Sequence, residues 1–192
     1  MSQLKVNSIV PVGGLPSGAS GGIIQVVSAA TTSVSSYSVS SGGVSTLCSG
    51  LQPSITPSSN SNNVLISLCL SAATSGGGVA VSLFRGSTQI FLADADGNRQ
   101  RVSTMQTYEN THQLANVNIT FLDTGISTTS ATTYGIKLSH CSGSSQTMYI
   151  NRDNNNDTKD GKTKDVNMIA VQSVSYDYKN NKGQVLGTSK IA

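Results

Sequence analysis

The chain has 192 residues, a length that fits one domain of about 100–200 residues. Only 11% of the residues are charged, the formal net charge is +3, and Ser, Thr, Asn and Gly supply close to half of the chain. Disordered chains combine low hydrophobicity with high net charge, so this composition predicts a folded protein. The Lys and Arg residues form no dense basic stripe, and we therefore expect no nucleic-acid partner.

The most apolar stretch spans residues 64–73 and is interrupted by Ser67 and Ser71. A membrane-spanning helix needs about 20 apolar residues, so we expect no membrane insertion. The first residues lack a basic region followed by an apolar run, which predicts no signal peptide. The three cysteines, Cys48, Cys69 and Cys141, form no Cys-x-x-Cys pair, and we expect them to be reduced and buried.

Residues 1–22 differ from the rest of the chain. A short apolar string is followed by closely spaced Gly and Pro, which break helices and strands alike. We therefore interpret residues 1–22 as an extended arm that docks on another protein. The apolar residues of this arm are Leu4, Val6, Ile9, Val10 and Val12.

From Ile23 onward, short β-type runs alternate with clusters of Gly, Pro, Asn and Ser. Residues 64–72 show a two-residue period, with Val64, Ile66 and Leu68 on one face, as expected for an inner strand. No helical periodicity appears. The sequence predicts an all-β head over residues 23–178, an antiparallel β-sandwich or jelly roll, with a polar tail over residues 179–192. The predicted strands are 23–30, 44–51, 64–72, 79–84, 88–93, 101–108, 117–122, 133–139, 147–151 and 166–178.

The last of these runs is apolar on both faces. A strand at the edge of a monomer is normally blunted by charge or polarity, so we expect a neighbouring subunit to cover it in a closed homotrimer. The alternative is that the arm or the 151–165 loop folds over it. The predicted subunit-interface residues are Val166, Met168, Ile169 and Val171.

Catalytic and metal sites have little support in the sequence. There is one Glu, Glu109, two histidines, His112 and His140, and no Gly-x-Ser-x-Gly motif. The Asp-rich loops 94–98 and 153–157 miss required positions of a calcium loop. We therefore expect no enzyme activity, no metal and no cofactor.

Aromatic side chains stack on sugars in many binding sites, and the chain has six tyrosines and no tryptophan. Tyr108 and Tyr149 are the candidate glycan contacts. A host surface glycan or protein is therefore a possible partner.

Three groups of segments carry a family resemblance: LKVNSI with GGIIQVVSA, LQPSITPSSNSNNVLISLCLSA with SLFRGSTQI, and TTYGIKLSHCSGSSQTMYINRDNNND with VNMIAVQSVSYD. Together they resemble small virion proteins of tailed phages, particularly marine cyanophages, over residues 4–178. The resemblance implies a non-enzymatic virion structural protein made in the host cytoplasm. Its docking arm would carry a trimeric head similar to complement C1q and tumour-necrosis-factor jelly rolls.

Several functions remain open at this point. A tail-fibre-like or knob appendage would serve host attachment, whereas a capsid decoration protein would clamp capsomers. The chain has no coiled coil or repeat that could form a fibre shaft. The competing classes are a bacterial carbohydrate-binding module and a glycan-cleaving enzyme, and paired carboxylates for the latter are scarce.

Overall fold

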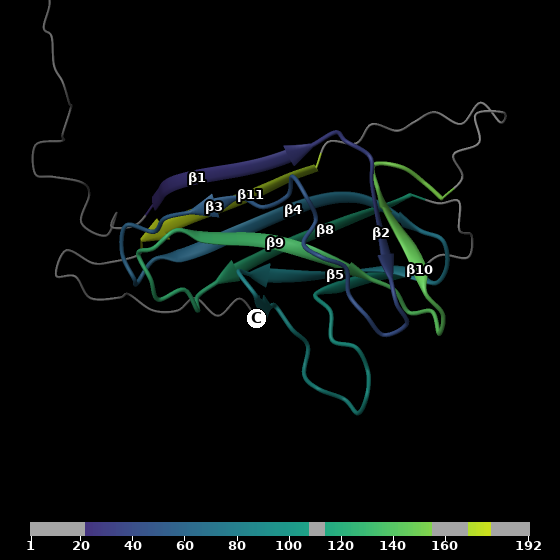
Figure 1. The fold of residues 1–192 in the computed structure, drawn as a ribbon. Helices are drawn as coiled ribbons and strands as arrows, with labels where there is room; N and C mark the ends of the chain where they lie inside the picture. Colours follow the sequence, from purple (N-terminus) through teal and green to yellow (C-terminus); the bar gives the residue numbers. More distant parts are fainter. Residues whose placement is uncertain (1–21, 108–113, 155–168, 178–192) are drawn as a thin grey trace, which may run out of the picture.

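The computed structural model describes residues 22–107, 114–154 and 169–177, and the description of the last range is confined to its backbone. Eleven strands in these ranges form two antiparallel sheets (Figure 1). The all-β prediction is confirmed, and the two sheets enclose one apolar core as in a β-sandwich. Residues 1–21 of the predicted arm and the whole predicted tail over residues 179–192 lie outside the described residues, and Gly22 begins the first strand.

The six-stranded sheet is organised around β4 (Asn63–Thr74). One side of β4 pairs with β8 (Ala115–Asp123), and the other pairs with β11 (Ile169–Asp177) and then with β10 (Gln146–Ile150). Beyond β11 lies β1 (Gly22–Thr31), and beyond β10 lies β2 (Ser35–Val39). Strand β4 is therefore long enough for two strand pairs, β11 with β1 and β10 with β2, to lie along the same side of it.

The five-stranded sheet has β5 (Gly78–Arg85) and β9 (Thr132–Ser139) at its centre. The outer side of β5 pairs with β7 (Thr104–Thr107) over its first half and with β6 (Thr88–Ile90) over its second half. The short strand β3 (Ser54–Ile55) pairs with β9. Core-facing residues of both sheets pack together, as the alternation over residues 64–70 predicted; they include Val64, Ile66, Leu68, Leu70, Val81, Leu83, Ile136 and Leu138.

The structure corrects three predictions about strands. The segment 44–51 is not a strand but an irregular segment beside β9. The Ser45 amide donates to the Leu138 carbonyl, and the Cys48 amide donates to the Ile136 carbonyl. Two strands, β2 and β3, were missed because they are short and Ser-rich. Finally, β11 is not at an edge, because its backbone pairs with β1 on one side and β4 on the other.

The cysteine prediction is correct only in part. All three cysteines are free, and Cys48 is buried, but Cys69 and Cys141 are exposed. Cys69 lies on the outer face of β4, where the two-residue period that buries its neighbours Leu68 and Leu70 turns it outward. Within the described ranges there is no helix long and apolar enough to cross a bilayer.

Candidate functional site

A buried carboxylate lies at one end of the sandwich, where the two sheets meet. The Asp123 side chain is only 5% exposed, and Arg85 Nη1 donates to both of its oxygens at 2.8 Å. The Tyr134 hydroxyl donates to Oδ2 at 2.7 Å, and the Gly125 amide donates to Oδ1 at 3.0 Å. The buried charge is therefore fully partnered, as such a charge must be to avoid a large desolvation cost.

The register of the strands explains why these residues meet. Arg85 is the last residue of β5 and pairs directly with Tyr134 of β9, while Asp123 is the last residue of β8 in the opposite sheet. The cluster therefore ties one sheet to the other. Burial, and then the hydrogen bond to the Asp123 carboxylate, raise the pKa of Tyr134 above its ordinary value, so the phenol remains a donor at neutral pH.

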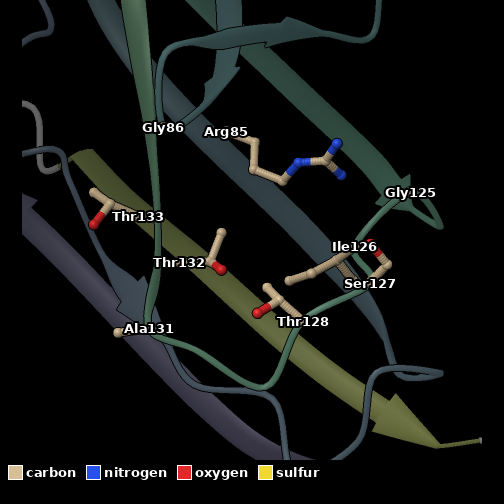
Figure 2. Close-up of a pocket in the computed structure, with 9 residues that line it drawn as sticks. All are labelled: Arg85, Gly86, Gly125, Ile126, Ser127, Thr128, Ala131, Thr132 and Thr133. Atoms are coloured by element: carbon tan, nitrogen blue, oxygen red, sulfur yellow. The ribbon is translucent and has the colours of Figure 1, made fainter.

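An open cleft of about 410 Å³ lies beside this cluster. Its walls are the end of β5 with the following turn, the 125–131 part of the β8–β9 loop, and the start of β9 (Figure 2). Four of the lining side chains carry hydroxyls and one carries a charge. The lining residues are Arg85, Gly86, Gly125, Ile126, Ser127, Thr128, Ala131, Thr132 and Thr133.

Glycine at position 125 keeps the cleft open beside the cation. A Cβ built there would lie 3.1 Å from Arg85 Nη1 and 3.4 Å from Asp123 Oδ1. A side chain would therefore press on the ion pair. Because the Asp123 side chain also accepts from the amide two residues on, the Asp-Thr-Gly sequence forms an Asx-turn. This signal is readable in the sequence, but the prediction from the sequence did not use it.

A second candidate is the free edge of β1. Its sequence, GIIQVVSAAT, contains no charged residue and no proline, and one side of the strand pairs with β11. Among the described residues no strand pairs with the other side. Val26 on this strand is 56% exposed. A long, uncharged, unblunted edge is a template for pairing with another chain.

The sequence-predicted site residues that the structure describes, Tyr149, Ile169 and Val171, do not line the cleft. The arm residues Leu4 to Val12, together with Val166, Met168 and Tyr108, lie outside the described residues. Ile169 and Val171 begin β11 and pair with Thr31 and Ala29 of β1. Because β1 and β4 occupy both sides of β11, the edge position assumed for this strand is wrong, while the homotrimer stays a prediction.

Tyr149, the other glycan candidate, has little free surface. Only 9% of it is exposed, and the Arg152 guanidinium lies over its ring at 4.2 Å. A cation over the aromatic face is a favourable contact and occupies the surface on which a sugar would stack. The cleft beside Arg85, in contrast, is open, and it contains no aromatic lining residue.

Two of the ionisable candidates, His140 and Asp96, have structural partners, while Glu109, His112 and Asp157 lie outside the described residues. His140 is buried, with Nε2 at 3.1 Å from the Val39 carbonyl, and its Nδ1 accepts from the Ser142 amide at 3.2 Å. Asp96 forms an exposed ion pair with Arg99. Within the described part of the chain no three His, Cys, Asp or Glu residues converge as a metal site would require.

No family model matches this chain, and the search of curated proteins found no match.

Proposed function

We propose that the protein is a non-enzymatic structural component of a phage particle, made in the host cytoplasm and present in the virion. The arm over residues 1–22 docks on a larger particle protein, and the sandwich head projects as a tail-fibre-like or knob appendage. The observation that supports this role best is the outer edge of β1, which no strand among the described residues pairs with and which directly follows the arm in sequence. An unblunted edge with an exposed Val26 is what a chain that assembles with others would carry.

The buried polar groups are consistent with a structural role. The Asp123 carboxylate accepts three different donors, and both ring nitrogens of His140 have partners. Catalytic acids and nucleophiles need unoccupied positions toward a substrate. Here these groups contribute hydrogen bonds that fix strands and turns.

The test is incorporation into particles. A chain that lacks residues 1–20 retains all of β1 and should fold as a head but fail to enter particles, whereas the full chain should enter them. Mass spectrometry of purified particles measures the incorporation, and circular dichroism checks the fold. Equal incorporation of the truncated and full chains would refute the docking role of the arm.

Copy number separates the two places on the particle. A tail appendage is expected in a few to a few dozen copies, and a capsid decoration protein in tens to hundreds. If the chain is absent from particles and is displayed on bacterial cells instead, the alternative of a bacterial carbohydrate-binding module gains support and the particle role is rejected.

A further inference from the structure

Among the described residues, the hydrogen bonds of the Arg85 guanidinium come from one of its three nitrogens. Both contacts to Asp123 come from Nη1. The Tyr134 hydroxyl is a close neighbour of the guanidinium; burial raises the pKa of that hydroxyl, and the guanidinium acts to lower it. Within the described part of the chain, no acceptor is found in direct hydrogen-bond geometry at Nε or Nη2, and neither is among the buried nitrogens that lack a partner. These two nitrogens therefore reach solvent, and the Arg85 side chain is 25% exposed.

The unused nitrogens have a specific geometry. Nε–H and one Nη2–H bond are nearly parallel, and together they form the side-on fork that matches the two oxygens of a carboxylate. The fork is held in place because Asp123 fixes Nη1 from the other side. An immobilised guanidinium loses less side-chain entropy on binding a ligand than a free one does.

The negative charge of Asp123 is shared between Arg85 and other donors. The same carboxylate also accepts from the Tyr134 hydroxyl at 2.7 Å and from the Gly125 amide at 3.0 Å. Three donors therefore share one negative charge. The outward side of the guanidinium remains attractive to an anion.

The rest of the cleft is lined by groups that both donate and accept. Figure 2 shows Arg85 on one wall, Ser127 and Thr128 on the adjoining loop, and Thr132 and Thr133 on β9. Thr133 adjoins Tyr134 on β9, so its side chain points to the opposite face of the strand from Arg85. Among the described residues, the Ser127 hydroxyl has no hydrogen-bond partner, and the Thr132 hydroxyl, which donates to the Ser130 carbonyl, can still accept a hydrogen bond. Hydroxyls of this kind complement the ring hydroxyls of a sugar.

We propose that this cleft binds an acidic sugar, with its carboxylate on the Nε and Nη2 fork of Arg85 and its ring hydroxyls on Ser127 and Thr132. A uronic acid unit is the ligand class that joins a planar carboxylate to a hydroxylated ring. The inference goes beyond the proposed particle role and does not depend on it, because binding by the purified chain can be measured without particles.

The experiment titrates the purified full chain with three probes: an oligosaccharide of galacturonic acid, the corresponding galactose oligosaccharide, and a short acidic peptide. Calorimetry or NMR shifts give the dissociation constants. We expect the galacturonate probe to bind about tenfold or more tightly than the neutral sugar, because it adds a charge-assisted bidentate contact. The acidic peptide should bind more weakly than galacturonate, since it lacks the ring hydroxyls.

Two sets of variants locate the site. Arg85→Lys retains a positive charge but loses the fork, and it should weaken galacturonate binding about tenfold. Ser127→Ala combined with Thr132→Val removes two hydroxyls of the cleft lining, and it should weaken binding about fivefold or more. The matched control is Thr120→Val on the exposed face of β8, outside the cleft, which should bind as the original protein does.

Each outcome bears on the proposal. Equal binding of the galacturonate and galactose probes would overturn the role of the carboxylate, and equal binding of the acidic peptide would overturn the choice of a sugar. Thermal melts show whether each variant is folded. Should Arg85→Lys unfold, the hydroxyl variant still decides, because undiminished binding by that variant removes the ligand from this cleft.

Discussion

Strands β1 and β8 form two edges of the same sheet, and they differ in the side chains that they expose. On β8 the exposed positions are polar, at Asn116, Asn118 and Thr120. Its end is also covered by the chain itself, since the rings of Phe91 and Phe121 stack with centroids 4.7 Å apart. Covering an edge in this way prevents pairing with another chain.

No comparable cover is found on β1. Its exposed positions include Val26, and in the described structure no strand pairs with its second side. Among the described residues both strands pair on one side, but the exposed side chains of β8 are polar whereas β1 exposes Val26. If this comparison is correct, changes near β8 should alter stability, and changes on β1 should alter assembly.

The largest expected effect follows Asp123→Ala at the end of β8. The change leaves the Tyr134 hydroxyl buried without its acceptor and removes the partner of Arg85, which remains partly solvated. We expect the free energy of unfolding to fall by about 3 kcal/mol, at the low end for a broken buried pair. Urea unfolding measures it.

Asp96→Ala is the matched control, because it breaks the exposed ion pair with Arg99. It should change stability by less than about 0.5 kcal/mol. Similar effects of the two variants would show that the Asp123 cluster does not tie the sheets together.

Alkaline pH should weaken the same region. The pKa of Tyr134 is raised by burial, so above about pH 10 the unfolded chain releases this proton while the folded chain retains it. The free energy of unfolding should then fall with rising pH by about 1.4 kcal/mol per pH unit for this group. Burial also raises the pKa of Cys48 to about 12, which adds a loss in the same direction.

The contribution of Tyr134 is isolated by comparing Tyr134→Phe with the original protein between pH 10 and 11. The variant cannot ionise at this position, so its stability should depend less steeply on pH. Parallel pH profiles would mean that the Tyr134 hydroxyl titrates normally in the folded protein.

Removing the aromatic cover of β8 should have a smaller effect. Phe91→Ala loses the ring contact with Phe121, and because Phe91 is already 41% exposed we expect a loss of about 1 kcal/mol. Sedimentation should also show more self-association, since the β8 edge is then less protected. A variant that is destabilised yet remains unchanged in association would show that the ring contributes to packing only.

The smallest effect on stability is expected on β1. Val26→Lys adds a charge to an exposed position and should change the free energy of unfolding by less than about 0.5 kcal/mol. A lysine blunts an edge strand, so incorporation into particles should nevertheless fall. Thr120→Lys on β8 provides the control and should be incorporated normally; equal losses for both variants would remove the distinction between the edges.

Much of the core could be predicted from sequence because its strands follow a two-residue period. Val64, Ile66 and Leu68 of β4 are buried as that period requires. The strand β2 is less apparent, since its sequence SSYSV is mostly serine and its position depends on pairing with β10. Local sequence cannot reveal a strand that is stabilised mainly by its neighbour.

The Asp123 cluster is a feature that could not be predicted from the sequence. Arg85 and Asp123 lie 38 residues apart, and they meet only because β5 and β8 end at the same end of the sandwich. Nothing local to either residue predicts that meeting. The segment 44–51 was mistaken for a strand because it is apolar and β-branched, whereas Gly50 has a φ of +75° and the segment bonds to β9 irregularly.

Gold labelling of intact particles, with antibodies against the sandwich head, tests the central claim most directly. The account predicts label on the surface of particles carrying the full chain, and none on particles made with the chain that lacks residues 1–20. Label that persists without the arm would contradict docking through residues 1–22, and a complete absence of label from particles would contradict the structural role itself.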